Sequence, residues 1–422
     1  MVSLDKLSKI GFGSYRVSSA NQQHRDALEK AIAYGCNLLD TAPNYMNGKS
    51  EELIGEVVRN CGDNLFIISK VGYIQGDDLK YFHSHNFDDI IKINDSFWYS
   101  LDIKFIEAQI NRILARLNRD VLDGFLLHNP EHYFTDESMS KEILYSKIEN
   151  VFYYLEKLVR KGVIRYYGIS SNTIPLALDN AKTLSLSRLY RSAEKVSGDH
   201  HFKIVQFPYN YYENDGSSVI HDENESLVAL AKKFKLVTIV NRPLNAETKQ
   251  GFIRLATYDS QVTCLNGASD LLLFENVFEF VLRRLSDQGM EGEWDKFPIL
   301  VHLKSNWSKI GNPEAVEKIF YEHFYPFLNV LYENKIPNEL ANLLKELFSK
   351  AVLYSRKKMT ERANELEQKL IASSEIKSNN DSFAYRMCQT YLDKGIDHVL
   401  VGLKNNEYVT EFQKGFSIKS SR

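Results

Sequence analysis

Four residues at or just after the ends of short apolar runs have side chains suited to proton transfer. Asp40 ends NLLD, Tyr45 follows five residues later, Lys70 ends LFIISK and His128 ends LDGFLLH. A phenol is a poor acid at neutral pH, but an adjacent ammonium favours its ionised form and lowers its pKa. If the four side chains meet, Asp40 keeps Lys70 oriented and protonated, and Tyr45 becomes a competent proton donor.

The reaction that fits these groups is the polar reduction of a carbonyl, or the reverse oxidation of an alcohol. A hydride would reach the carbonyl carbon while Tyr45 protonates the oxygen, to which a neutral His128 imidazole can donate a hydrogen bond. No side chain can supply a hydride, so this chemistry needs an organic cofactor. The residues therefore predict an oxidoreductase whose catalytic residues are Asp40, Tyr45, Lys70 and His128.

Eight short β-rich runs alternate with longer helical stretches, a pattern typical of βα units around a parallel sheet. Eight such units fit a closed (β/α)8 TIM barrel of the α/β class better than an open sheet. The C-terminal ends of barrel strands share one mouth, so the four residues would become neighbours there. The runs span residues 9–17, 37–40, 65–70, 122–128, 163–171, 202–207, 236–241 and 398–404.

The connection between the seventh and eighth strands is several times longer than usual. We therefore expect a barrel formed by residues 1–255 and 381–422, and a large, mainly helical insertion over 256–380. Segments such as DLLLFENVFEFVLRRL place apolar residues along one face of a helix. The insertion either packs on itself and the barrel's side or forms a lid or oligomerisation element, and the sequence leaves these alternatives open.

Composition, the N-terminal pattern and the spacing of cysteine and histidine bear on the partners, location and metal content to be expected. The 422 residues carry a formal charge of −3 with a pI near 6.4, which gives no reason to expect nucleic acid or an anionic membrane. The N-terminus lacks the pattern of a signal peptide, so we expect a cytoplasmic protein. Cysteines 36, 61, 264 and 388 have no zinc-site spacing, and His83 with His85 lacks a third ligand, so no metal is predicted.

These motifs resemble those of the aldo-keto reductase family over residues 1–255 and 383–415. The likeness rests on GFGSYRV, LLDTAPNY with GKSEELIG, ISKVG, LLHNPE, YYGISSN, VQFPYN and VLVGLKNNEYV. It implies a (β/α)8 barrel without a metal and an NADP(H) cofactor lying across the strand ends. It also implies that Tyr45 is the general acid, that Lys70 and Asp40 tune it, and that His128 orients a small-molecule carbonyl substrate.

The resemblance further implies which residues contact the cofactor and the substrate. Ser170, Ser171 and Gln206 would hold the nicotinamide carboxamide. Tyr15 would border the substrate. Apart from the resemblance, the long segment 73–101, which contains Trp98, is a candidate for part of the substrate wall. The other cofactor candidates are Gly13 and Ser14 in the first loop, Asn241, Arg242, Pro243 and Leu244 after the seventh strand, and Lys404 and Asn405 after the eighth.

Two departures from the family pattern affect the cofactor prediction. Many members place an aromatic residue after the seventh strand to stack on the nicotinamide, where this chain has Arg242, so stacking is either lost or provided by the guanidinium. Many NADPH-specific members have an arginine near the position of Tyr408, and Lys404 offers only a point charge for a phosphate. We expect NADP as the cofactor and leave NAD open.

Two other functions fit parts of the sequence. Some relatives keep the cofactor site but act as binding or regulatory subunits, so a cofactor sensor acting through the insertion is the main alternative. A non-redox barrel enzyme using Lys70 as a Schiff base is disfavoured because Asp40 opposes the depressed lysine pKa that such a step needs. The physiological substrate, the favoured direction and the oligomeric state are not predicted.

Overall fold

The structure is a computed structural model that describes residues 2–59, 64–83, 89–248, 251–258, 268–307 and 311–417. The chain divides into two compact units, one formed by residues 1–247 and 380–422 and the other by residues 248–379. Three residues considered above, Cys61, His85 and Cys264, lie outside the described ranges. Cys36 and Cys388 are buried free thiols.

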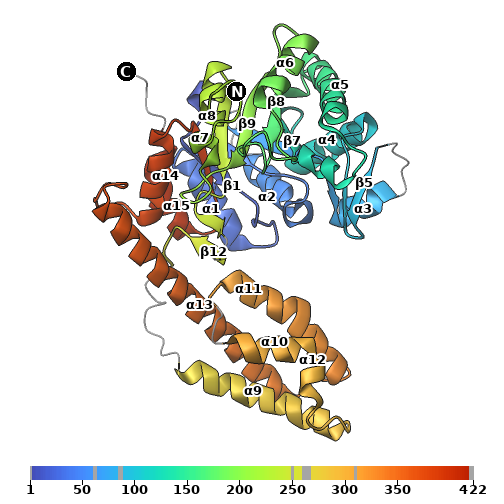
Figure 1. Cartoon of the computed structure of the whole chain (residues 1–422), viewed down its shortest axis with the longest axis vertical. Coiled ribbons are helices and arrows are strands. Elements are labelled where there is room, and N and C mark those ends of the chain that lie inside the picture. Colours follow the sequence, from blue (N-terminus) through green and yellow to red (C-terminus); the bar gives the residue numbers. More distant parts are fainter. Residues whose placement is uncertain are drawn as a thin grey trace. The chain divides into compact units, whose positions relative to one another are not determined.

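The first unit is a closed barrel of eight strands, which confirms the predicted fold (Figure 1). Around the barrel the order is β1-β13-β10-β9-β8-β7-β3-β2, and the paired strands are parallel. All eight predicted runs supply one strand each. The strands are β1 (Ile10–Gly13), β2 (Leu38–Asp40), β3 (Phe66–Val71), β7 (Leu122–His128), β8 (Ile164–Ser170), β9 (Phe202–Pro208), β10 (Val237–Asn241) and β13 (His398–Val401).

Helices alternate with the barrel strands along the chain. Several begin at a polar residue whose side chain accepts a backbone N–H of the first turn, including Asp102 and Ser140. Such caps satisfy donors that a helix start leaves free, so they fix where each helix begins. The helices are α1 (Gln22–Ala33), α2 (Lys49–Val58), α3 (Gly76–His83), α4 (Ile103–Leu117), α5 (Lys141–Arg160), α6 (Leu186–Val196), α7 (Asp215–Ser218), α8 (Leu227–Lys233), α14 (Phe383–Asp393) and α15 (Asn406–Phe412).

A small antiparallel sheet follows the third barrel strand. It has the order β4-β6-β5 and consists of β4 (Tyr73–Gln75), β5 (Ile91–Asn94) and β6 (Phe97–Tyr99). Gly72 joins β3 to β4 with a φ of 141°, and a Cβ there would lie 2.5 Å from the Tyr99 ring. Glycine therefore permits both the backbone turn and the close packing that bring this sheet next to the end of β3.

The second unit is mainly helical and lies in the chain between β10 and β13, as expected (Figure 1). Its residues pack into a core of their own that includes Val277, Val281, Leu300, Phe320 and Leu344. The chain reaches this unit through β11 (Asn245–Thr248) and β12 (Gly251–Arg254), and its helices are α9 (Ala268–Asp287), α10 (Pro298–Asn306), α11 (Pro313–Lys318), α12 (Tyr325–Leu331) and α13 (Asn338–Ala372). No helix among the described residues has the length and apolar character needed to cross a membrane.

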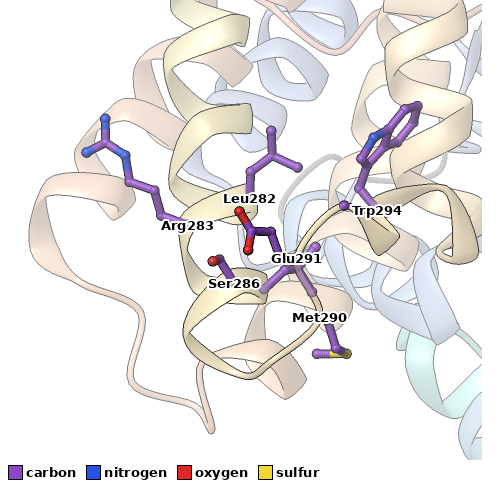
Figure 2. A pocket seen from close by; sticks show the side chains of 8 residues that line it. Leu282, Arg283, Ser286, Met290, Glu291 and Trp294 are labelled. Carbon is purple, nitrogen blue, oxygen red and sulfur yellow. The ribbon is translucent and has the colours of Figure 1, made fainter.

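A pocket of about 420 Å³ lies at the C-terminal end of α9, within the helical unit. Figure 2 shows Leu282, Arg283, Met290, Glu291 and Trp294 among the side chains that line it. The lining mixes apolar groups with two opposite charges, and it includes none of the predicted site residues.

Candidate active site

Strand alternation explains why polar residues gather at one end of the barrel. Apolar side chains from six barrel strands form one cluster, which includes Leu38, Ile68, Leu126 and Ile204. Side chains two residues apart on a strand point to the same face. The residues two places later on these four strands are Asp40, Lys70, His128 and Gln206. Each polar side chain therefore lies above an apolar one, at the C-terminal end of its strand.

The predicted ion pair of Asp40 and Lys70 is present and buried. The Lys70 Nζ atom lies 2.7 Å from Asp40 Oδ2, and the two side chains are 0% and 4% exposed. Lys70 Nζ also donates to the Thr41 carbonyl oxygen at 2.9 Å and lies 3.1 Å from Tyr45 Oη. Burying either charge alone would be costly, and the short pair with its additional acceptors offsets that cost.

The expected lowering of the Tyr45 pKa is wrong for this structure. Burial raises the pKa of the Tyr45 phenol well above its usual value, and the negative charge of Asp40 and the nearby Tyr15 hydroxyl raise it further. Burial also lowers the pKa of Lys70, although Asp40 opposes that shift. The rise in the Tyr45 pKa caused by burial is therefore larger than the lowering expected from the Lys70 ammonium. Tyr45 is a protonated phenol at neutral pH.

His128 lies beside this centre as predicted. Its side chain is buried, and its ring centroid is 6.2 Å from that of Tyr45. Burial lowers the pKa of His128 well below its usual value, and the charge of Lys70 acts in the same direction. The imidazole is therefore neutral at physiological pH, which agrees with the prediction of a neutral hydrogen-bond donor.

Aromatic rings surround the predicted catalytic groups on the side of the small sheet. The Tyr73 ring lies 4.5 Å from His128 and stacks on Phe97 at 4.8 Å, and its hydroxyl lies 2.8 Å from His132 Nε2. Burial lowers the pKa of His132 to about 4, so this ring is also neutral. Tyr15, predicted to border the substrate, is 60% exposed and meets the Tyr45 ring edge-on at 5.2 Å.

Trp98 is not brought to this group. It packs against His83 and Lys92, with centroid distances of 5.5 Å and 4.5 Å. Successive residues of a strand point to opposite faces, so Phe97, and not Trp98, shares the face that carries Tyr73. The sequence reasoning missed Tyr73, Phe97 and His132. The pairing of β4 with β6, which aligns Gln75 with Phe97 and Ile74 with Trp98, decides which ring shares the face of Tyr73, and the sequence by itself does not show it.

The side chains predicted to hold the carboxamide already form hydrogen bonds with protein groups. Ser170 Oγ donates to Gln206 Oε1 at 2.9 Å, and Gln206 Nε2 donates to Asp40 Oδ1 at 2.8 Å. The Ser171 hydroxyl oxygen accepts the backbone N–H groups of Thr173 and Ile174. Ser171 therefore shapes the turn after β8, while Ser170 and Gln206 face the ion pair.

The segment after β10 contains polar atoms without partners. Asn241 Oδ1, Arg242 Nε and Asn245 Oδ1 are buried and have no hydrogen-bond partner among the described residues. The Arg242 guanidinium pairs with Glu213 at 2.9 Å, and Arg242 has a φ of 52°, which a non-glycine residue seldom adopts. Unpaired buried groups of this kind are expected where a polar ligand binds.

The remaining residues predicted to contact the cofactor differ in burial and in hydrogen bonding. Gly13 pairs with Asp40 across β1 and β2, and the buried Ser14 hydroxyl donates to the Asp40 carbonyl oxygen at 2.6 Å. Pro243 accepts the Tyr391 hydroxyl at 3.0 Å and Leu244 is buried. Lys404 is exposed, and its charge adds to burial in lowering the pKa of His24, while Asn405 caps α15. No group of three candidate metal ligands occurs in the described ranges.

Comparison of the sequence with known proteins identifies relatives of this chain. The profile of the Aldo/keto reductase family matches residues 9–260. The uncharacterized oxidoreductase YqkF of Bacillus subtilis is 28% identical over 166 residues, which cover 39% of this chain and 45% of that protein. The NAD(P)H-dependent D-xylose reductase I,II of Candida tropicalis is 30% identical over 184 residues, covering 40% and 49%. The chain spans about half the length of the curated relatives it matches.

Solved structures with a related fold were also found. The glycerol dehydrogenase AKR11B4 from Gluconobacter oxydans is 15% identical, covers 97% of this chain and 87% of its own, and has a TM-score of 0.49. An aldo/keto reductase from Klebsiella pneumoniae in complex with NADP and acetate is 22% identical, covers 56% and 65%, and has a TM-score of 0.38. The family assignment rests instead on the sequence match. Because that match runs from β1 through β10, over more than half of the chain, the protein belongs to the aldo/keto reductase family.

Proposed function

We propose that this chain is an NAD(P)H-dependent oxidoreductase that reduces an aldehyde or ketone to an alcohol, or catalyses the reverse reaction. The observation that supports this most is the arrangement around Lys70. An ammonium has three N–H donors and no lone pair, and Lys70 Nζ has three acceptors, namely Asp40, Thr41 and Tyr45. Tyr45 Oη must then accept from Lys70, so the phenolic hydrogen is free to point at a substrate.

Each of the four residues has one role in the proposed reaction. Neutral His128 donates a hydrogen bond to the substrate carbonyl oxygen and so fixes its position. Tyr45 transfers its proton to that oxygen as negative charge develops, and the Lys70 ammonium stabilises the phenolate that remains. Asp40 holds Lys70 in place. The dihydronicotinamide, when bound, supplies the hydride that no side chain can provide.

The residues present fit a nicotinamide cofactor. Ser170 uses its only hydroxyl hydrogen in the hydrogen bond that it donates to Gln206. The lone pairs of its oxygen can therefore accept a hydrogen bond from a carboxamide NH2 group. The unpaired polar atoms of Asn241, Arg242 and Asn245 offer further contacts along the rim. Lys404 and Asn405 would lie on the side of the adenosine phosphate. We therefore propose NADP as the cofactor, with NAD as the second candidate.

One assay separates the proposed function from its alternatives. Purified protein is mixed with NADPH and a panel of aldehydes and ketones, and the loss of dihydronicotinamide absorbance is followed. Turnover supports the reductase. Tight NADPH binding without turnover of any carbonyl supports a regulatory protein acting through the helical unit. Reductive trapping of a carbonyl compound on Lys70 would indicate Schiff-base chemistry, which the three hydrogen bonds of its ammonium oppose.

The pH dependence of reduction should show a broad plateau. The proton donor is present below the pKa of Tyr45, which burial raises above 10.0, and the hydrogen-bonding imidazole is neutral above the pKa of His128, which burial lowers below 6.5. We expect kcat/KM to stay constant within about twofold between about pH 6.5 and pH 9. A loss of activity with rising pH inside that window would contradict the plateau and show that either the phenol or the Lys70 ammonium, whose pKa burial lowers, loses its proton there.

Arg242 should contribute to cofactor binding. We expect Arg242→Ala to weaken NADPH binding about tenfold, because the variant removes a buried donor and the guanidinium from the cofactor side of the mouth. The matched control is Arg191→Ala, which breaks an exposed Arg–Glu pair at 2.7 Å on the outer surface. Titration of NADPH fluorescence measures both. Equal dissociation constants for the two variants would mean that Arg242 serves only its pair with Glu213.

A further inference from the structure

The side-chain amide of Gln206 lies between the proposed cofactor contact and the ion pair. Its Nε2 atom is 2.8 Å from Asp40 Oδ1, and its Oε1 atom accepts from Ser170 Oγ at 2.9 Å. Gln206 is fully buried, so solvent does not compete for either bond. The family resemblance gives Gln206 a contact with the nicotinamide carboxamide alone, but here both ends of its amide are engaged with protein groups.

The donor and acceptor groups present fix the direction of each hydrogen bond in the series that runs from Ser170 through Gln206, Asp40 and Lys70 to Tyr45. An ionised carboxylate only accepts, so the NH2 end of Gln206 must face Asp40 and the carbonyl end must face Ser170. Ser170 then donates its single proton to Gln206 and keeps only lone pairs for a ligand. On the other side, Asp40 uses Oδ1 for Gln206 and Oδ2 for Lys70, and Lys70 in turn donates to Tyr45.

We propose that Gln206 is a positioning residue that links the cofactor contact at Ser170 to the Asp40, Lys70 and Tyr45 centre. This proposal rests on the proposed function. Gln206 holds the Asp40 carboxylate so that its second oxygen faces Lys70, and it turns the Ser170 hydroxyl so that an acceptor faces the carboxamide. Loss of the amide therefore affects proton donation and cofactor affinity together, although Gln206 lies beyond hydrogen-bond contact with Tyr45.

The sharpest test is Gln206→Glu, because a protonated carboxyl can reproduce both bonds and an ionised one cannot. In its neutral form the introduced group donates to Asp40 and accepts from Ser170. In its ionised form it places a second negative charge against Asp40, and burial with like charge raises its pKa. Among the described residues, Asp40 bonds directly to Gln206, Lys70 bonds to Asp40 and Tyr45, and His128 is in register with Ser170 on the neighbouring strand. The variant should behave like wild type at about pH 5.5 and lose kcat at least tenfold by about pH 8.

The second readout is NADPH affinity, which requires no turnover. In Gln206→Glu the dissociation constant, from NADPH fluorescence, should rise about tenfold over the same pH range, while the wild-type value stays constant. The control is Asn172→Asp, which introduces the same amide-to-carboxyl change at an exposed neighbour of Ser171. Its kcat and dissociation constant should follow the wild-type pH dependence.

The outcomes separate this proposal from the proposed function. Failure of wild type to reduce any carbonyl overturns the proposed function, while the pH dependence of NADPH binding still tests Gln206. Wild-type pH profiles of both kcat and binding in Gln206→Glu, together with wild-type values in a folded Gln206→Met protein, overturn the positioning role, because a carboxyl that stays protonated keeps both bonds whereas Met keeps neither. If that variant is unfolded by circular dichroism, Gln206→Met decides. A folded Gln206→Met protein should lose about tenfold in kcat and in NADPH affinity, and wild-type values for both overturn the proposal.

Discussion

Replacement of Tyr45 by Phe is expected to lower kcat about a thousandfold while NADPH affinity stays within about twofold of wild type. The variant keeps the ring that meets Tyr15 and His128 but removes the phenolic proton that the proposed mechanism transfers to the carbonyl oxygen. Water can replace the phenol only poorly, because Lys70 is fully buried and its remaining acceptors are protein groups. Steady-state kinetics with the best carbonyl of the panel gives the ratio.

The control for this variant is Tyr34→Phe, at the C-terminal end of α1, where the side chain is exposed and the hydroxyl loss should change nothing. Removal of the Tyr45 hydroxyl also leaves one Lys70 N–H without its partner, at a cost of about 1–3 kcal/mol in the free energy of unfolding. Kinetics are therefore measured well below the unfolding midpoint. Wild-type turnover in Tyr45→Phe would refute the role assigned to the phenol.

The barrel and its polar mouth could be predicted from the sequence because both depend on local patterns. A buried parallel strand needs a short apolar run, and the residue at its end inherits a position on the rim, so Asp40, Lys70 and His128 could be placed from their runs alone. Tyr45 followed because its short spacing from Asp40 leaves it on the same loop. The contacts among the four then needed only the closure of the barrel.

Other features of the site could not be predicted from the sequence. They depend on contacts between distant segments, or on which of two adjacent strand residues points to a given face. Trp98 and Phe97 are adjacent in the sequence, and only the pairing of β6 with β4 decides which one shares a face with Tyr73. The pair of Arg242 with Glu213 joins two loops. The rise in the Tyr45 pKa results from desolvation by the whole surrounding structure, while the sequence showed only the nearby ammonium.

Replacement of Lys70 by Met is expected to damage stability and activity together. Among the described residues, the variant leaves the buried Asp40 charge with Gln206 as its remaining side-chain donor, which should lower the free energy of unfolding by about 3–5 kcal/mol. It also removes the cation that stabilises the Tyr45 phenolate, so kcat should fall about a hundredfold or more. Denaturant unfolding and steady-state kinetics measure the two effects.

The double variant Asp40→Asn with Lys70→Met separates the effect on stability from the effect on activity. Removal of both charges ends the desolvation penalty, so at least about half of the lost stability should return, while turnover stays low because Tyr45 still lacks its ammonium. Lys80→Met is the control, since it breaks a Lys–Asp pair whose side chains are 82% and 66% exposed and should leave the free energy of unfolding close to the wild-type value. If the double variant recovers activity as well as stability, Lys70 has a structural role only. Tyr45 would then donate its proton without a neighbouring cation.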